Sequence, residues 1–289
     1  MNLITEESNP SSVNLDLMST EEILKVINNE DKTVPLAVEH AIPYIAQAVE
    51  MIIIQIKHGG KVIYFGCGTS GRIGALDASE WESTFNAGDL VKAFIGSNDD
   101  NYEEGYNTAL HNVKENDVVI GLSASGQTPY VIGALEASKL KGAKTISIIS
   151  NPIELSQKIA HLSDITIPVI TGPEVIRGST RMKAGTAQKL VLNMISTTVM
   201  VKLGKVYSNM MIMVRPLNNK LRERAIKMVS EIAGVDKNVA EQAYNISNND
   251  VRIAVLLALG VKDVSTALKI LEKNEGNLRK SISQLLHRT

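Results

Sequence analysis

The sequence predicts an α/β fold: a three-layer αβα sandwich with a mostly parallel, doubly wound sheet, followed by a small all-helical C-terminal unit. Five short apolar runs alternate with helical patterns between residues 61 and 169. Each run is apolar on both faces, which is typical of buried parallel strands. After Pro216 no further strand-like run occurs. Alternation of strand and helix is the pattern of a doubly wound sheet.

The N-terminal part is expected to be helical. Residues 1–20 are polar and predict an arm, after which Ser19 or Thr20 caps a short helix. From 36 to 56, apolar residues recur every three or four positions, which predicts an amphipathic helix. Pro43 lies inside this stretch and should kink the helix or split it in two.

The central part supplies the sheet and its helices. The expected strands are 61–65, 90–95, 117–122, 144–149 and 165–169, and the expected intervening helices are 71–79, about 102–114, 129–140 and 153–162. A long, mostly apolar helix is expected over 183–203. It is interpreted either as a core helix of its own domain or as one that also lines a dimer interface.

The C-terminal part is predicted to form short helices separated by glycine and asparagine. The expected helices are 218–232, 236–244, 250–259, 263–273 and 277–287. We therefore expect two domains, a sheet domain with its N-terminal arm over 1–232 and a helical domain over 233–289. In size, and in Leu259-Gly260-Val261, the last three helices resemble a small ubiquitin-associated-like unit.

Composition excludes several classes of function. The chain has 289 residues, 30 Lys+Arg and 31 Asp+Glu, and this balance is not that of a nonspecific nucleic-acid binder. Five histidines and the single Cys67 show no metal-ligand spacing, so no metal is expected. No apolar run reaches the length of a membrane span, and the polar N-terminus is not a signal peptide. We expect a cytoplasmic protein without membrane or nucleic-acid partners.

Two loops predict a site for an anion. The first loop, Gly66–Arg72, and the second loop, Ser123–Pro129, each lie between an expected strand and an expected helix. Their glycines allow close backbone approach, their hydroxyls donate hydrogen bonds, and N–H groups at the helix start point outward. Open α/β sheets bind ligands at this edge. The paired loops predict a small phosphorylated ligand, although glycine-rich turns can also be mere connections.

A dinucleotide site is the alternative for the first loop. Gly66, Gly68 and Gly71 spell G-x-G-x-x-G, but no acidic residue ends the next strand, where Ile95-Gly96-Ser97 stands. No Gly-Lys-Ser/Thr follows either loop, so neither is a P-loop.

Several longer motifs resemble the N-acetylmuramic acid 6-phosphate etherase family, of the sugar isomerase (SIS) domain superfamily. They occupy residues 28–38, 66–80, 124–132, 178–189 and 192–197. The resemblance covers nearly the whole chain and implies an αβα sandwich that binds phosphosugars as a homodimer. It implies cleavage of the D-lactyl ether of N-acetylmuramic acid 6-phosphate to N-acetylglucosamine 6-phosphate and D-lactate, by elimination and then addition of water, without metal or redox cofactor.

The resemblance also implies roles for single residues. Glu80 matches the proton-donating glutamate of the family. The residues that match ligand-binding positions are Thr69, Ser70, Ser123, Ser125, Gln127, Thr128, Glu174 and Lys183. Lys183 is expected to reach across a dimer interface, and the alternative is that it only begins its helix. From spacing alone, Glu80 could equally be a solvated surface residue.

The sequence departs from the family pattern at three places. The segment 96–105 is about a dozen residues shorter than expected and lacks the family's second catalytic glutamate. Asp100, Glu103 or Glu104 could replace this carboxylate. Met213 stands where the family has Asp, and Cys67 where it has Ala, a small loop residue without a redox role.

Three functions therefore compete. The first is an active etherase, which is a carbon–oxygen lyase. The second is a catalytically impaired regulatory protein that binds a phosphosugar, suggested by the missing glutamate. The third is an aldose–ketose isomerase, which the Arg181-Met182-Lys183 segment disfavours.

Overall fold

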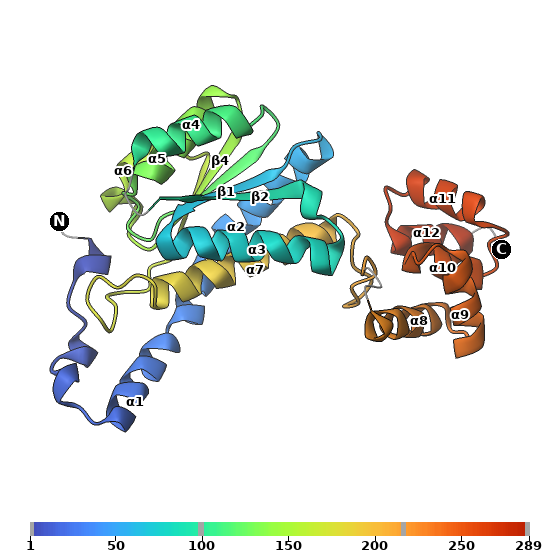
Figure 1. Ribbon diagram of the computed structural model, residues 1–289, viewed down its shortest axis with the longest axis horizontal. Coiled ribbons are helices and arrows are strands. Elements are labelled where there is room, and N and C mark those ends of the chain that lie inside the picture. The colour runs from blue at the N-terminus through green and yellow to red at the C-terminus, as the bar shows by residue number, and fades with distance from the viewer. Residues whose placement is uncertain (1–2, 98–100, 215–217, 287–289) are drawn as a thin grey trace. The chain divides into compact units, whose positions relative to one another are not determined.

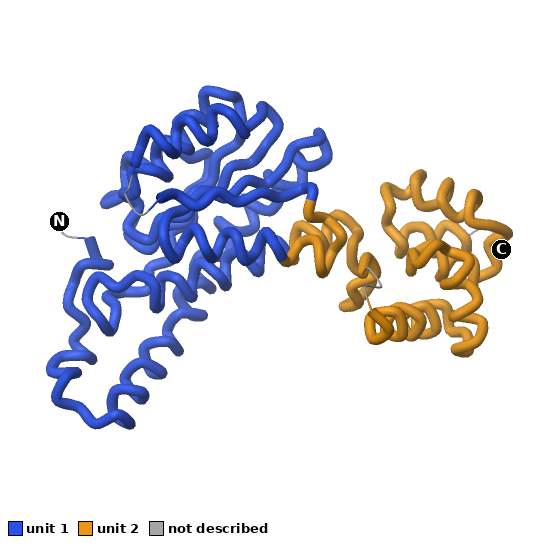
Figure 2. The backbone as a smooth tube through the Cα atoms, viewed as in Figure 1, with its two compact units in different colours: residues 1–79, 89–196 blue, residues 80–88, 197–289 orange. Residues whose placement is uncertain are grey.

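The computed structural model describes residues 3–97, 101–214 and 218–286. The chain forms two compact units (Figure 2). The first comprises Met1–Ser79 and Asp89–Ser196, and the second comprises Glu80–Gly88 and Thr197–Thr289.

The first unit is built on a five-stranded, all-parallel sheet. The strands are β1 (Val62–Cys67), β2 (Val91–Gly96), β3 (Val118–Leu122), β4 (Lys144–Ile149) and β5 (Ile165–Pro168), in the order β2-β1-β3-β4-β5. Every residue of β3, and all of β1 but its last, is buried, as central strands covered on both faces require. β2, at the edge of the sheet, is buried only at its first and last residues, Val91 and Gly96. The predicted doubly wound sandwich is confirmed.

Helices cover both faces of this sheet. In Figure 1, α4, α5 and α6 lie on one face, and α2, α3 and α7 lie on the other. The helix bounds are α1 Thr20–Asp31, α2 Val34–Lys57, α3 Gly68–Phe85, α4 Tyr102–Asn112, α5 Pro129–Leu140, α6 Gln157–His161 and α7 Lys183–Lys202. Short 3-10 turns are η1 (Ile4–Glu6), η2 (Pro10–Ser12), η3 (Leu15–Leu17), η4 (Gly88–Leu90) and η5 (Ile153–Leu155).

The N-terminal helices begin as predicted, and Pro43 does not split the second of them. Ser19 caps α1 through a capping box with Glu22. α2 runs unbroken through Pro43, so of the two expected effects of this proline the split did not occur, and the kink stays a prediction. The lost backbone hydrogen bond is offset because α2 buries eight side chains, Val34, Val38, Ala41, Ile45, Ala48, Val49, Ile52 and Ile53.

The same region bears on the membrane prediction. By length and composition, 20–57 is long and apolar enough to cross a membrane, which corrects the expectation that no stretch reaches that threshold. Core helices of soluble proteins pass the same test, and α2 packs on β5.

α4 and α5 pack closely because each presents a glycine to the other. A Cβ atom on Gly105 of α4 would overlap the carbonyl oxygen of Tyr130, and one on Gly133 of α5 would overlap that of Tyr102. The two backbones therefore touch without side chains between them. This contact fixes the start of α4 against the start of α5.

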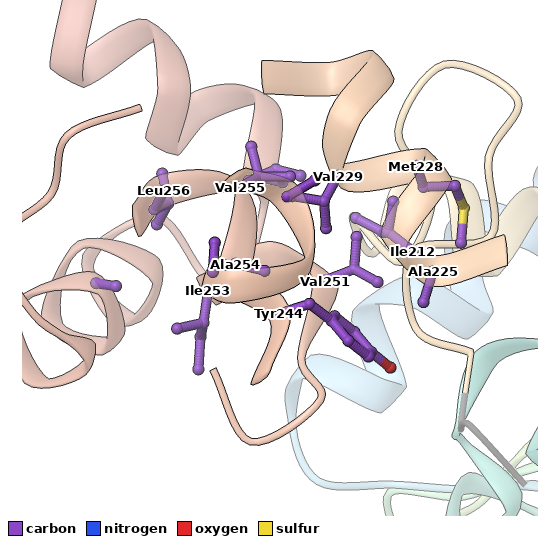
Figure 3. Packing of buried hydrophobic residues seen from close by; sticks show 14 of the residues in the cluster. Ile212, Ala225, Met228, Val229, Tyr244, Val251, Ile253, Ala254, Val255 and Leu256 are labelled. Atoms are coloured by element: carbon purple, nitrogen blue, oxygen red, sulfur yellow. The ribbon is translucent and has the colours of Figure 1, made fainter. Parts of the chain in front are cut away.

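The second unit contains α8 (Asn219–Ala233), α9 (Lys237–Ile246), α10 (Val251–Ala258), α11 (Val264–Lys273) and α12 (Leu278–Leu286). Its core is made of buried side chains from these helices and from the preceding segment, including Ile212, Ala225, Val229, Tyr244 and Val255 (Figure 3). Asp236, Asp250 and Asp263 cap α9, α10 and α11. α8 packs with α9 and α10 in this unit, and the division into 1–232 and 233–289 stays a prediction.

The close approach of α4 and α5 predicts an intolerance to added side chains. Replacing Gly105 with Ala should lower the free energy of unfolding by about 1–3 kcal/mol, because the methyl group meets backbone that cannot move aside. Urea denaturation measures the difference. Gly185→Ala on α7 is the control, since its Cβ would find its nearest neighbours at 3.5 Å. Equal stability of the two variants would contradict this packing.

Candidate functional site

The sheet places the two predicted loops side by side. β1 pairs with β3 so that Gly66 lies opposite Leu122, and the first and second loops leave the sheet from this register. α3 then continues on one face of the sheet and α5 on the other (Figure 1). This is the switch point at which open α/β sheets bind ligands.

In the first loop, the strand passes directly into the helix. β1 ends at Cys67 and α3 begins at Gly68, which has φ +51°. A Cβ on Gly71 would overlap the carbonyl oxygen of Gly66, so this turn excludes larger residues. Thr69 and Ser70 are half-buried in the first turn of α3. The N–H groups of a first helical turn have no intrahelical acceptor and attract anions.

The second loop gathers its hydroxyls around Ser123. The Ser123 Oγ lies 2.7 Å from Thr128 Oγ1 and 3.5 Å from Ser125 Oγ, and it accepts the N–H of Gly126 at 3.0 Å. The N–H of Gln127 donates to Ser125 Oγ at 3.2 Å. Gly126 has φ +72°, a conformation that favours glycine. The structure thus brings together the four predicted residues of this loop at the start of α5.

Glu174 and Lys183 are both buried, and they organise the start of α7. Both carboxylate oxygens of Glu174 accept backbone N–H groups at 2.9 Å, one from Lys183 and one from Ala184. A carboxylate at this end of a helix is stabilised by the unpaired N–H groups. The side chain of Lys183, 3% exposed, places its Nζ 2.7 Å from Glu30 Oε2 of α1. In this chain Lys183 both begins its helix and binds α1.

Glu30 is the counter-ion of this buried lysine. Burial opposes ionisation of Glu30, but the hydrogen bonds from Lys183 and Asn9 outweigh it and hold the pKa of Glu30 below its ordinary value. The Asn9 amide donates to the same Oε2 at 2.8 Å and to the carbonyl of Pro173 at 3.0 Å. Charge and hydrogen bonds therefore join α1, the N-terminal arm (residues 1–20) and the start of α7.

Glu80 is exposed on α3, roughly two turns after the first loop. It belongs to the segment Glu80–Gly88 of the second unit. The helix that carries it is fixed by Asp77, whose carboxylate accepts the Tyr64 hydroxyl at 2.9 Å and the Ser196 hydroxyl at 3.1 Å. Asp77 thereby joins β1, α3 and α7, a role that sequence analysis missed.

The three candidates for a second carboxylate differ in their surroundings. Asp100 lies outside the described residues. Glu103 is exposed on α4. Glu104 accepts the Ser97 hydroxyl at 2.6 Å and the Ser97 N–H at 3.1 Å. Burial, and next the charge of Glu104, raise the pKa of Tyr130 above its ordinary value. Cys67 pairs with Gly96, the residue before Ser97, so the hydrogen bonds to Ser97 hold Glu104 near the first loop.

A cavity of about 630 Å³ adjoins the second loop through Gly126 and Gln127. Lys158 lies on its rim, 5.8 Å from the ring centroid of Tyr102. Burial, and next the hydrogen bond to Glu136, raise the pKa of Tyr102 to about 12, so this phenol is neutral at physiological pH.

Further buried polar groups escaped sequence analysis because nothing local marks them. Asn151, which is fully buried, contacts the second loop. Thr171 Oγ1 and both polar atoms of Gln188 are buried without a hydrogen-bond partner. Such groups are rare in folded proteins and point to a bound water or ligand. Among the described residues, no three His, Cys, Asp or Glu side chains are grouped to hold a metal ion.

Comparison with known proteins connects this geometry to a family. Residues 32–150 match the family model of the SIS domain. An N-acetylmuramic acid 6-phosphate etherase from Actinobacillus pleuropneumoniae serotype 7 is 46% identical over 97% of this chain and 95% of that protein. One from Caldanaerobacter subterraneus subsp. tengcongensis is 48% identical over the same shares.

Solved structures share the fold of the first unit. The c3406 protein of E. coli CFT073 is 22% identical, with a TM-score of 0.51 over 66% of this chain and 97% of that chain. The phosphoheptose isomerase GmhA from Neisseria gonorrhoeae is 18% identical, with a TM-score of 0.50 over 63% of this chain and 98% of its own. At these identities the likeness concerns the fold alone.

The buried pair of Glu30 and Lys183 predicts a dependence of stability on acid. Glu30→Gln should lower the free energy of unfolding at pH 7 by about 3 kcal/mol, because the buried ammonium loses its ionised partner. The pKa of Glu30 in the folded protein lies below its ordinary value of 4.5. The ionised Glu30 therefore adds to the free energy of unfolding above pH 4.5, and this contribution is lost as the pH falls through the folded pKa.

Urea denaturation between pH 7 and about pH 3 tests this, with Glu39→Gln, an exposed site on α2, as the control. The difference in free energy of unfolding between wild type and Glu30→Gln should become smaller in acid, while the control variant keeps the stability of wild type at each pH. A gap that stays constant over this range would refute the ion pair.

Proposed function

The chain belongs to the N-acetylmuramic acid 6-phosphate etherase family, and we propose that its second loop binds the substrate phosphate while Glu80 protonates the departing lactate. It is a carbon–oxygen lyase that cleaves the D-lactyl ether of N-acetylmuramic acid 6-phosphate in the recycling of cell-wall amino sugars. The products are N-acetylglucosamine 6-phosphate and D-lactate. The observation that carries the assignment of the site is the cluster of hydroxyls around Ser123 at the switch point of the sheet.

The second loop suits a phosphate better than a neutral ligand. The hydroxyls of Ser123, Ser125 and Thr128 lie together where α5 begins, and the helix dipole adds positive potential there. Gln127 is exposed on the same loop. Thr69 and Ser70 in the neighbouring loop are then placed for the sugar. Glu174 acts on the site through the backbone N–H groups that begin α7, and Lys183, paired with Glu30, holds that helix start against α1.

The reaction needs two proton-transfer groups. In the open-chain sugar, the aldehyde acidifies the proton on the second carbon. A base removes this proton, the bond from the third carbon to the lactyl oxygen breaks, and an acid gives that oxygen a proton. Water then adds to the double bond, its hydroxyl to the third carbon and a proton to the second. Two carboxylates with separated pKa values perform such chemistry.

Of the three candidates, Glu104 is the one we assign as the base. Its hydrogen bonds to Ser97 hold it where β2 ends, and the pairing of Gly96 with Cys67 places this strand end beside the first loop. Glu103, one residue earlier on α4, is exposed. Glu104 lies in the first turn of α4 and is bound to Ser97, which directly follows β2. A rigid scaffold of strand and helix therefore positions its carboxylate, as catalysis requires.

Membership of the etherase family also supports proposals for the oligomeric state, the binding partners and the cellular location of the protein. Leu36 and Ile54, about five helical turns apart, are exposed on the side of α2 opposite its buried side chains, which supports a homodimer formed over this helix. The partner implied is a small phosphosugar, with no nucleic acid, membrane, metal or other cofactor, and the location implied is the cytoplasm.

The competing functions have less support. Etherases at 46% and 48% identity over almost the whole chain do not favour a regulator that has lost catalysis. The isomerase hypothesis rests on fold alone, and fold does not determine reaction.

Loss of the proton donor should abolish turnover and spare binding. Glu80→Gln should lower kcat for D-lactate release by about 10²–10⁴-fold, because the leaving lactate then departs unprotonated. The affinity for N-acetylglucosamine 6-phosphate should stay within about twofold of wild type. Glu50→Gln, exposed on α2, is the control. Wild-type rates in Glu80→Gln would exclude Glu80 as the acid.

The base is tested by isotope exchange. Incubated with N-acetylglucosamine 6-phosphate in D₂O, the wild type should exchange the proton on the second carbon, and so should Glu80→Gln. Glu104→Gln should lose this exchange by about 10²-fold or more, and Glu103→Gln should keep it. Exchange in Glu104→Gln at the wild-type rate would assign the base elsewhere.

A further inference from the structure

The buried side-chain amide of Asn151 donates hydrogen bonds to the backbone of the second loop. Asn151 follows β4, and its Nδ2 lies 3.2 Å from the carbonyl oxygen of Ser125 and 3.4 Å from that of Ala124. The N–H of Ser150 donates to the same Ala124 carbonyl at 2.9 Å. Asn151 is fully buried, so water does not replace these contacts.

These bonds act on the face of the loop that would meet the phosphate. In a trans peptide, the C=O and the following N–H point in opposite directions across one plane. Fixing the Ser125 carbonyl toward Asn151 therefore aims the N–H of Gly126 the other way, into the loop, where it donates to the Oγ of Ser123 at 3.0 Å and to its carbonyl at 3.1 Å. This peptide thereby helps to hold the Ser123 hydroxyl that is proposed to meet the phosphate. Fixing the Ala124 carbonyl likewise orients the N–H of Ser125. Asn151 thus sets the direction of the loop's donors without touching a ligand.

Asn151 is itself oriented by the N-terminal arm. The Thr5 N–H donates to Asn151 Oδ1 at 3.3 Å, and the Thr5 Oγ1 accepts from Asn151 Nδ2 at 3.1 Å. Thr5 is 1% exposed, although it lies in a 3-10 turn near the chain start. The two bonds are reciprocal, so they select which end of the amide faces the loop.

Other contacts hold the arm in place. Arg177 Nε donates to the carbonyl of Glu6 at 2.7 Å, and Asn9 donates to the carbonyl of Pro173. Ser156 lies against the same part of the loop: its Oγ donates to the Ser125 carbonyl at 3.5 Å, and a Cβ on Gly126 would overlap this oxygen. Asn151 and Ser156 therefore share the Ser125 carbonyl as acceptor, and the loop packs closely against both.

We propose that Thr5 and Asn151 are positioning residues for the substrate phosphate, so that the N-terminal arm is a working part of the site. The proposal rests on the second loop being the phosphate site, as assigned above. Without the Thr5 hydroxyl, the Asn151 Nδ2 loses one acceptor and only the Thr5 N–H still orients the buried amide from the arm, so the alignment of the second loop is weakened.

The test compares Thr5→Val, which removes the hydroxyl and keeps the shape, with Thr5→Ser, which retains the hydroxyl. Ser12→Ala is the matched control, because that hydroxyl donates to the carbonyl of Asn9 in the same arm. In the full-length protein, three quantities are measured: KM and kcat for N-acetylmuramic acid 6-phosphate, Kd for N-acetylglucosamine 6-phosphate, and amide hydrogen exchange over residues 120–129.

Thr5→Val should raise both KM and Kd by about five- to tenfold, the effect of one buried hydrogen bond, with kcat within about twofold. Exchange over 120–129 should accelerate. Thr5→Ser and Ser12→Ala should match wild type in all three. If Thr5→Val yields no folded protein, Thr5→Ala is measured in its place.

Unchanged KM, Kd and exchange in a folded Thr5→Val would overturn the proposal. So would a loss of kcat at constant KM with a lowered Tm, which a merely structural contact gives. Failure of the proposed function can be distinguished from failure of this proposal. If the function were wrong, the wild type would release no lactate, and amide hydrogen exchange over residues 120–129 would still show whether Thr5 holds the loop.

Discussion

The site depends on one constraint, the register of β1 against β3. Because Gly66 lies opposite Leu122, two glycine-containing loops leave the sheet next to each other, and their helices depart to opposite faces. Shifting that register would separate the loops. Specific contacts of both strands hold it: a Cβ on Gly121 of β3 would lie 2.6 Å from Val131 Cγ1 of α5, and the Tyr64 hydroxyl of β1 donates to Asp77 of α3.

Behind the loops stand buried polar groups that fix positions and touch no solvent. Asp77 joins β1, α3 and α7, Glu174 anchors the start of α7, and Asn151 orients the second loop. Each is hydrogen-bonded, as the cost of burying a polar group demands. The groups proposed to meet the sugar phosphate are therefore short hydroxyl side chains on backbone that is already positioned, which lowers the entropy lost on binding.

The sequence predicted what local patterns control. The five strands, the loops after β1 and β3, and the Ser19 cap follow from periodicity, glycine spacing and capping chemistry. Long-range contacts lie outside such patterns. The pairing of Lys183 with Glu30 and of Asn151 with Thr5 joins residues 153 and 146 positions apart. Pro43 does not split α2, because the tertiary burial of this helix outweighs the local cost of proline.

The central claim is that the second loop binds the phosphate of the sugar. A crystal structure of the wild-type protein with bound N-acetylglucosamine 6-phosphate tests it most directly. The account predicts phosphate oxygens within about 3.2 Å of the Ser123 or Ser125 hydroxyl and of backbone N–H groups at the start of α5. A phosphate bound elsewhere, with the second loop in contact only with water, would contradict it.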